Sequence, residues 1–494
     1  MLYKSTRNSD VKVTAAEAIS KGISDDGGLF VPEYIPKFTE NDFNELKTLD
    51  YIGIAKKVLE RYLDDFTAEE LDYCVKGAYS GTFDNDEPAP LYKLENGKYV
   101  LELWHGPTCA FKDLALQLLP YLLTTSAKKV GKGKAVILVA TSGDTGKAAL
   151  EGFCDVPNTE IMVFYPNNGV SPMQKLQMDT QKGKNVFVCA INGNFDDAQS
   201  SVKTIFTDNK TKDILRENGM EFSSANSINW GRLVPQIVYY VASYCNLLKD
   251  GADLKDGFDI VVPTGNFGNI LAAYYAKEMG VPVRRLVCAS NANNVLTDFI
   301  KTGKYDRNRE FFTSVSPSMD ILISSNLERM VYHLLGNDAK ITATYQKSLS
   351  ENGEYTVSSE VFEKLKALYF GGCCDDEKTL ETIKSVYDKY NYLCDTHTAV
   401  AVSVAEEYLS ENGNNRPIVI ASTASPYKFA ASVLRAIDAD KCSDDEFKMV
   451  EELSKATNTK VPEPIMNLSN ATVRFNNVCE KKDIKEVVLK NLGL

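Results

Sequence analysis

One lysine follows a Gly-Pro break in the stretch WHGPTCAFKDLA, residues 104–115. Lys112 stands directly after Phe111, at the start of an apolar helical run. A surface lysine keeps its ammonium in water, whereas a lysine desolvated in a cleft can lose its proton and act as a nucleophile or form a Schiff base. The stretch by itself leaves both alternatives open.

A second motif, TSGDTG (141–146), is small, rich in hydroxyl groups and placed between an apolar run and a helical pattern. Its main-chain N–H groups and the following helix dipole favour an anion-binding loop. A carboxylate would repel an anion, so we expect Asp144 to turn away and cap the helix. An ordinary turn with a capping Asp is the alternative. A nucleotide-binding P-loop is excluded, because that motif needs Gly at Thr141 and Ser or Thr at Ala148.

Three further loops carry groups suited to binding an anionic or heteroaromatic ligand. TGNFGN (264–269) can direct several amides at one phosphate, and STASP (422–426) offers hydroxyls that can hydrogen-bond a ring nitrogen. NSINWGR (226–232) carries an arginine suited to phosphate. The alternatives are an Asn-rich turn, helix capping by Ser and Thr, and a surface arginine at a helix start.

Alternating apolar runs and helical patterns must position these loops. Apolar runs end just before polar loops and helical patterns five times, which indicates βαβ units and a parallel sheet. Ligands of such sheets bind at the carboxyl ends of the strands, where these loops converge. The runs are residues 135–140, 161–166, 186–191, 258–263 and 417–422.

The length of 494 residues predicts more than one domain. We expect a mostly helical region at 1–95, a smaller α/β region at 96–245 that carries Lys112 and the TSGDTG loop, and a larger one at 246–494. The last of these contains the TGNFGN loop and, from about residue 440, a C-terminal helical elaboration.

Composition excludes several classes of function. The net charge of −12 disfavours nucleic acid and anionic membranes as partners. The eleven cysteines show no paired metal spacing and there are three histidines, so we expect no metal site. Without a secretion signal or a membrane-spanning run, the odd cysteine count predicts a cytoplasmic protein.

Taken in order along the chain, the motifs resemble those of the threonine synthases, pyridoxal-phosphate enzymes of the tryptophan-synthase-β type. The resemblance extends over nearly the whole chain, and its N-terminal part looks like the longer bacterial and fungal form. The segments that carry it are YKSTRN, TAAEAISKGI, DGGLFVPEYIP, HGPTCAFKD, TSGDTG, NSINWGR, PTGNFGN and STASPYKF.

The resemblance implies a fold and a set of roles. The fold is α/β, with two doubly wound open parallel-sheet domains of fold type II, a helical N-terminal region and a C-terminal elaboration. Lys112 would hold pyridoxal 5′-phosphate as a Schiff base and act as the catalytic residue, and Thr423 would face the pyridine nitrogen. The cofactor phosphate would be bound by Gly265, Asn266, Phe267, Gly268 and Asn269. The substrate carboxylate would be bound by Ser142, Gly143, Asp144, Thr145 and Gly146, and the substrate phosphate by Asn229 and Arg232 with Ser227.

The implied activity converts O-phospho-L-homoserine and water to L-threonine and phosphate, by γ-elimination and β-replacement, in a monomer or homodimer. A related lyase of the same fold, such as a threonine dehydratase or an O-phospho-amino-acid phospholyase, is the alternative. Two positions depart from related sequences. Asp144 stands where many relatives of the wider fold have Asn, and Ser425 stands where many family members have His.

Overall fold

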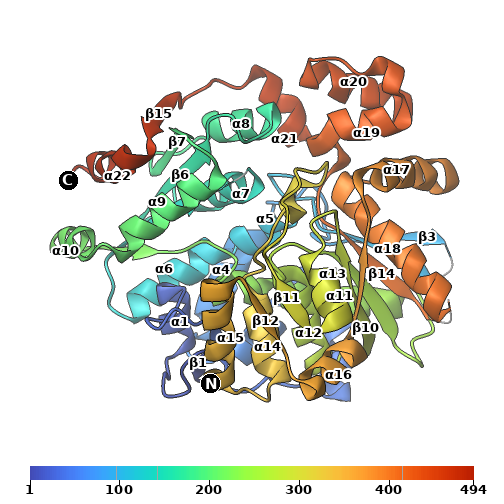
Figure 1. Ribbon diagram of the computed structural model, residues 1–494, viewed down its shortest axis with the longest axis horizontal. Coiled ribbons are helices and arrows are strands. Elements are labelled where there is room, and N and C mark those ends of the chain that lie inside the picture. The colour runs from blue at the N-terminus through green and yellow to red at the C-terminus, as the bar shows by residue number, and fades with distance from the viewer. Residues whose placement is uncertain (96, 142, 414–415) are drawn as a thin grey trace.

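The computed structural model describes residues 1–95, 97–141, 143–413 and 416–494. Within these residues, two mainly parallel sheets are each flanked by helices (Figure 1). We call them the larger sheet and the smaller sheet. The predicted α/β fold class is confirmed.

The larger sheet has the strand order β13-β10-β9-β14-β4-β3 among the described residues. Its strands pair in parallel except β3, which runs antiparallel to β4 at one edge. Alternate residues of β9 enter different apolar clusters, with Ile260 and Val262 in one and Val261 in another, so both faces are covered. The strands are β3 (Leu91–Glu95), β4 (Lys98–Glu102), β9 (Phe258–Pro263), β10 (Val283–Ser290), β13 (Tyr369–Cys373) and β14 (Ile418–Ser422).

The smaller sheet has the order β15-β7-β6-β5-β8 in the described chain, and all its strands are parallel. Ile137 and Val139 of β5 enter one apolar cluster, while Val136 and Leu138 enter another. This alternation is the pattern of a sheet buried on both faces. The strands are β5 (Lys134–Ala140), β6 (Thr159–Pro166), β7 (Val186–Asn192), β8 (Met220–Ser223) and β15 (Asn477–Glu480).

The N-terminal region is mostly helical, as expected, and adds a short hairpin-like pair, β1 (Tyr3–Ser5) with β2 (Phe30–Pro32). Thr14, Thr39 and Thr67 each begin a helix with a capping box, which satisfies main-chain N–H groups that the helix leaves free. The helices are α1 (Ala15–Lys21), α2 (Glu40–Leu46), α3 (Tyr51–Tyr62) and α4 (Ala68–Tyr79).

Helices connect the strands of both sheets. Around the smaller sheet they are α5 (Lys112–Leu116), α6 (Leu119–Lys129), α7 (Asp144–Phe153), α8 (Pro172–Asp179), α9 (Phe195–Thr207) and α10 (Asn209–Glu217). Around the larger sheet they are α12 (Gly268–Glu278), α13 (Val295–Thr302), α14 (Leu327–Leu334), α15 (Ala339–Asn352), α16 (Ser359–Leu368), α17 (Asp376–Tyr390), α18 (Thr396–Asn412) and α19 (Ala430–Ile437). The long helix α11 (Trp230–Lys249) leads from the smaller sheet to the larger one and packs against α3 and α12. The pair β11 (Lys304–Asp306) and β12 (Glu354–Thr356) lies beside them.

The chain passes between the two sheets more than once. From α19 it continues through α20 (Glu446–Thr457) and α21 (Glu463–Met466), then crosses to the smaller sheet, where β15 and α22 (Ile484–Asn491) lie (Figure 1). The division at residues 96 and 246 stays a prediction, but sheet membership does not follow it. Strand β4 belongs to the larger sheet, and β15 returns to the smaller one.

All five apolar runs singled out in the sequence form strands, within two residues of the expected bounds. The expected boundary at residue 246 falls within the last turn of α11, which ends at Lys249. No helix in the described part of the chain combines the length and apolarity needed to cross a membrane.

Candidate active site

The segment that carries Lys112 is attached to the STASP loop by main-chain pairing. Phe111 N–H donates to Thr423 O at 2.9 Å, and Ser425 N–H donates to Cys109 O at 3.0 Å. An antiparallel bridge joins Ala110 to Ala424 between these two bonds. Lys112 therefore begins α5 next to Thr423, although the two residues are far apart in sequence.

Asp113 fixes the turn before Lys112. Its carboxylate accepts hydrogen bonds from Thr108 N–H at 2.8 Å and from Thr108 Oγ1 at 2.6 Å. The side chain is fully buried, and burial raises the pKa of Asp113 to about 6. Gly106 is required here, because a Cβ at that position would lie 2.5 Å from Asp113 Cβ.

The Lys112 amine is buried among charged groups. Only 8% of the residue is exposed; Nζ lies 4.9 Å from the centre of the Phe111 ring and 3.5 Å from Asp144 Oδ2. Burial lowers the pKa of Lys112; Asp144 opposes this shift, while the positive charges of Lys428 and Arg232 add to it. A buried amine with a lowered pKa is suited to Schiff-base or proton-transfer chemistry.

The expectation that Asp144 caps its helix is wrong. Gly143, with φ of 139°, occupies the N-cap of α7, and Asp144 makes no capping bond. Its buried carboxylate instead faces the site, where Lys428 Nζ lies 2.8 Å from Oδ1 and Gln174 Nε2 donates to the same oxygen at 3.1 Å. Burial would raise the pKa of Asp144, but the charges of Lys428 and then Lys112 outweigh it and hold that pKa well below its usual range.

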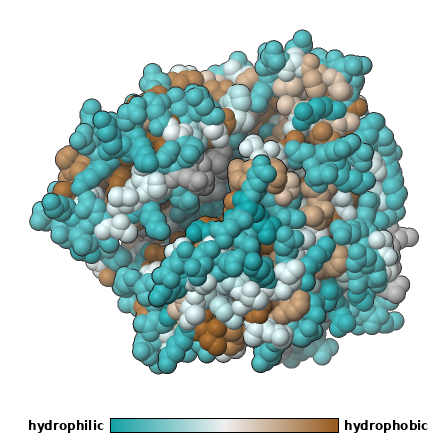
Figure 2. Space-filling view, in the orientation of Figure 1, coloured by the Kyte–Doolittle hydropathy of each residue, from teal (hydrophilic) through white to brown (hydrophobic). Residues whose placement is uncertain are grey.

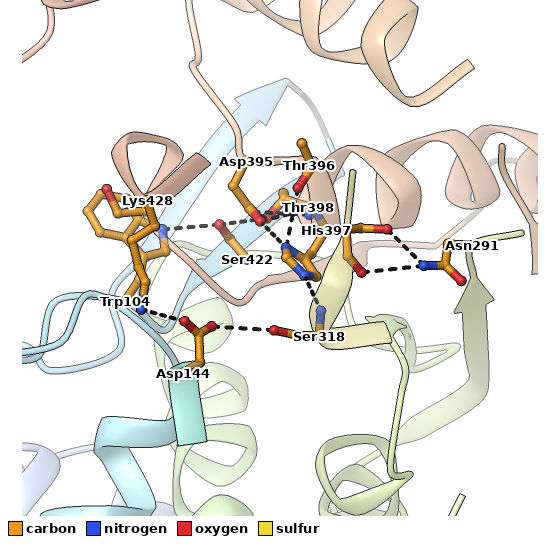
Figure 3. Close-up of polar contacts among 12 residues, drawn as sticks. Trp104, Asp144, Asn291, Ser318, Asp395, Thr396, His397, Thr398, Ser422 and Lys428 are labelled. Atoms are coloured by element: carbon orange, nitrogen blue, oxygen red, sulfur yellow. Dashed lines mark hydrogen bonds and ion pairs between the residues drawn. The ribbon is translucent and has the colours of Figure 1, made fainter. Parts of the chain in front are cut away.

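A network behind Asp144 connects it to the larger sheet (Figure 3). Ser318 Oγ donates to Asp144 Oδ2 at 3.3 Å, and Ser318 N–H donates to His397 Nε2 at 3.2 Å. His397 Nδ1 lies 2.7 Å from Asp395 Oδ2. Because Nε2 accepts a hydrogen bond, the imidazole hydrogen is assigned to Nδ1, facing Asp395. The network fixes the segment around Ser318 against Asp144.

The TSGDTG loop is ordered by Thr141, whose Oγ1 accepts from Gly143 N–H at 3.0 Å and Gly146 N–H at 2.9 Å. A Cβ at Gly143 would lie 2.3 Å from the Gln174 amide carbon, so the close approach requires glycine. Ser142, one of the predicted ligands of the substrate carboxylate, lies outside the described residues.

The TGNFGN loop joins β9 to the N-terminus of α12. Phe267 has a left-handed conformation, φ 62°, and its ring packs at 5.6 Å from that of Tyr369. Such a conformation costs a bulky residue about 1–2 kcal/mol and occurs preferentially at functional sites. Two residues of the segment 324–326 hold the loop in place. Ser324 Oγ donates to Gly265 O at 2.8 Å, and Asn326 N–H donates to Asn266 O at 3.1 Å.

The loop fits a phosphate group. The first N–H groups of an α-helix have no partners within the helix, and here they belong to Gly268 and the residues after it. Asn269 accepts hydrogen bonds from Tyr239 and Tyr240 through Oδ1, while its buried Nδ2 has no partner among the described residues. A buried donor without a partner is costly, so a phosphate oxygen would satisfy it.

The residues of the NSINWGR loop that were predicted to bind the substrate are of two kinds. Asn229 caps α11, and its side chain bonds to Gly231 N–H, Ile19 O and Ser224 O, which occupies both amide hydrogens. A substrate contact by Asn229 stays a prediction, with no unused amide hydrogen to make it. Ser227 Oγ lies 3.4 Å from Ser325 Oγ.

Arg232 is different, because it is buried without a carboxylate partner in the described chain. It is 5% exposed and donates to Ala225 O at 2.9 Å. Burial lowers the pKa of Arg232 to about 10. The positive charge of Arg232 also helps to lower the pKa of Lys112. An unneutralised buried guanidinium is a site prepared for an anion.

The molecule is hollowed on one face between the lobe of the smaller sheet and the body that carries the larger sheet (Figure 2). The loops that carry Lys112, Asp144, Phe267 and Thr423 all follow the carboxyl ends of strands in the two sheets. The loops after β4, β5 and β14 converge, since Lys112 and Lys428 both contact Asp144.

Sequence reasoning missed Lys428, Ser318, Gln174 and Asp113. Lys428 follows the STASP loop directly, so its position next to a predicted site was the signal that could have identified it. Ser318 has no comparable signal, because its contact with Asp144 joins positions 174 residues apart.

The sequence matches three family models in succession. They are described as threonine synthase N terminus over residues 2–79, pyridoxal-phosphate dependent enzyme over 83–424, and threonine synthase, C-terminal, over 398–488. Pyridoxal 5′-phosphate is thus the cofactor of the family, and the residues around Lys112 fit it.

Individual proteins agree. Threonine synthase from Pseudomonas aeruginosa is 39% identical, covering 88% of this chain and 90% of that protein. The crystal structure of PLP-bound threonine synthase from Brucella melitensis superposes with a TM-score of 0.88 at 36% identity, covering 99% of both chains.

Threonine synthase-like 1 from Pongo abelii is 40% identical over 85% of this chain, but the chain spans only 58% of that protein's length. The other relatives and the family models cover nearly all of the chain, and their similarity extends over both sheets. The chain therefore belongs to the threonine synthase family of pyridoxal-phosphate-dependent enzymes.

Proposed function

We propose that this protein converts O-phospho-L-homoserine and water to L-threonine and phosphate. The proposal rests on two buried cationic residues in one site. One is Lys112, and the other is Arg232, which has no carboxylate partner in the described chain. The first group suits the cofactor, and the second suits a phosphorylated substrate. A relative that acts on unphosphorylated threonine would have no use for the second.

The cofactor would be held by three parts of the site. Lys112 would bind it covalently, residues 265–269 would bind its phosphate, and Thr423 would face its ring nitrogen. When bound, pyridoxal phosphate supplies an electron sink for a carbanion at the substrate α-carbon. A threonine hydroxyl can hydrogen-bond the ring nitrogen without giving it a full charge.

The chain's own residues would bind the substrate at two anionic ends. Main-chain N–H groups of the loop 143–146 would receive the carboxylate, and Arg232 with Ser227 would receive the phosphate. Asp144 is held as a carboxylate by Lys428, so its side chain contributes no hydrogen-bond donor there. Lys112, once released by the substrate amine, would remove and return the proton at the α-carbon.

A related lyase is the second candidate for this fold, as the resemblance implied. It would share Lys112 and the loop 265–269, but a threonine dehydratase would not need Arg232.

We further propose that the protein acts in the cytoplasm as a monomer or homodimer, on a small substrate and without nucleic acid or membrane partners. The net charge of −12 supports the exclusion of polyanions.

Substitution of Lys112 tests the proposal. We expect Lys112→Ala to lose the visible absorbance of lysine-bound cofactor and more than 99% of phosphate release, a loss of at least about 10²-fold. Lys147→Ala, on α7 and paired with Glu151, is the matched control that should keep both. Unchanged absorbance in Lys112→Ala would assign the Schiff base to another lysine and contradict the proposal.

A further inference from the structure

Lys428 is a second buried lysine in the site. It lies in the short helical turn Pro426–Phe429 that follows the STASP loop, and its side chain is 0% exposed. Its ammonium donates to Thr108 O at 2.9 Å and lies 2.8 Å from Asp144 Oδ1. A buried ammonium requires such partners, so the position of Lys428 is closely determined.

The Asp144 carboxylate is shared unequally between the two lysines. Its short ion pair goes to Lys428, while Lys112 Nζ lies 3.5 Å from the other oxygen, beyond a strong charge-assisted bond. Gln174 and Ser318 occupy further positions around the same carboxylate. Five groups from five segments thus meet here, and Lys112 has the longest contact of the four donors (Figure 3 shows Lys428, Asp144 and Ser318).

The charged groups that face the Lys112 amine can be named element by element. Asp144 comes from α7, Lys428 from the turn after β14, and Arg232 from α11. Asp113 of α5 itself turns to Thr108, and Lys147 of α7 pairs with Glu151. The balance at Lys112 is therefore one negative charge against two positive charges.

We propose that Lys428 is a positioning residue that draws the Asp144 carboxylate away from Lys112 and also places its own positive charge near Lys112, so that Lys112 gives up its proton more readily than it would beside a free carboxylate. Among the described residues, Lys112 is the one cationic partner that Asp144 would keep without Lys428. The pair would then close and hold the proton on Lys112. The inference depends on the proposed role of Lys112, because it concerns the same nitrogen.

The test is a pH titration of the visible absorbance of the holoenzyme, between about pH 6 and pH 10. The quantity compared is the midpoint, the pH at which the absorbance lies halfway between its two limits. We expect Lys428→Met to move the midpoint upward by about one unit or more, because the opposing cation is gone. Asp144→Asn removes the anion instead and should move the midpoint downward. Lys147→Met, a lysine of α7 that does not face Lys112, is the control and should leave the midpoint unchanged.

The double variant Lys428→Met/Asp144→Asn restores the net charge around Lys112 and should return the midpoint close to that of the wild type. Lys428→Met alone can fail to bind the cofactor. In that case the midpoint of the double variant is compared with that of Asp144→Asn, and the inference requires it to be higher in the double variant. A purely structural role would lower cofactor occupancy without moving midpoints in opposite directions.

A midpoint in Lys428→Met equal to that of the wild type, or in the double variant equal to that of Asp144→Asn, would overturn the inference. A failure of the proposed role of Lys112 itself would give a different result. In that case Lys112→Ala would keep the visible band, whatever Lys428 does.

Discussion

Arg232 is the single residue that most clearly separates a phosphorylated substrate from an unphosphorylated one. Its guanidinium is buried against Ala225 O and has no carboxylate to neutralise it in the described chain. We expect Arg232→Ala to reduce kcat/KM for O-phospho-L-homoserine by about 10- to 150-fold, the range for one lost hydrogen bond to a charged group. Steady-state phosphate release measures this ratio.

Arg216→Ala is the control for that substitution, because Arg216 lies exposed on α10 beside Asp213 and should be neutral. An Arg232→Ala variant with an undiminished kcat/KM would place the substrate phosphate elsewhere. It would also remove the observation that distinguishes this site from that of a dehydratase.

Individual residues also show the limits of sequence reasoning. Thr423 and the glycine loop follow apolar runs that were expected to be strands, and Lys112 lies in a compact motif before a helical run. Each motif alone left an alternative open, and the resemblance of the ordered set to the threonine synthases implied their roles. Asp144 was identified as a site residue but given the wrong local role, because a capping Asp and an inward Asp have the same sequence pattern. What distinguishes them is Lys428, 284 positions later in the chain, and no local pattern connects the two.

At the scale of elements, the turn before α5 aligns Lys112 with the STASP loop. Gly106 permits this turn because a Cβ there would lie 2.5 Å from both Asp113 Cβ and Oδ2. We expect Gly106→Ala to displace the turn, to lower the free energy of unfolding by about 1–3 kcal/mol and to reduce kcat/KM by about tenfold or more. Denaturation midpoints and steady-state kinetics measure the two effects.

An activity loss in Gly106→Ala without loss of cofactor absorbance would show that the substrate, rather than the cofactor, is misaligned. Full activity with unchanged stability would mean that the turn can yield at no cost, which contradicts the tight packing of Asp113. Five strands were predicted at this scale, since an apolar run such as 258–263 that leads into a polar loop and a helical pattern is typical of a parallel sheet buried on both faces. Other strands of the two sheets, such as β4 and β13, were not predicted. The pairing order of the sheets was not predictable, because it depends on contacts between distant segments.

At the scale of the whole molecule, the two sheets are joined by segments that cross between them, and stability depends on groups far from the site. His333 of α14 lies between Tyr275 and Asn337, with Nε2 2.9 Å from the Tyr275 hydroxyl oxygen and Nδ1 3.0 Å from Asn337 Oδ1. Burial lowers the pKa of His333 to about 4 from its ordinary value of about 6.5. The folded protein therefore takes up this proton at lower pH than the unfolded chain does.

It follows that His333 stabilises the fold fully above about pH 6.5 and that this contribution is lost as the pH falls toward 4. We expect the wild type to lose on the order of 1–2 kcal/mol more free energy of unfolding than His333→Gln between pH 7.5 and pH 5. Urea denaturation of both proteins at the two pH values gives the difference. Equal losses in the two proteins would show that His333 titrates as it does in water.

The most direct test of the proposed activity follows both products of the wild-type holoenzyme supplied with O-phospho-L-homoserine. Because Lys112, Arg232 and the loop 143–146 together provide for the cofactor, the phosphate and the carboxylate, we expect equal amounts of phosphate and L-threonine. Phosphate released with a keto acid in place of threonine would contradict it and identify a phospholyase. No phosphate release from a protein that shows the cofactor's visible band would contradict the assignment of a phosphorylated substrate altogether.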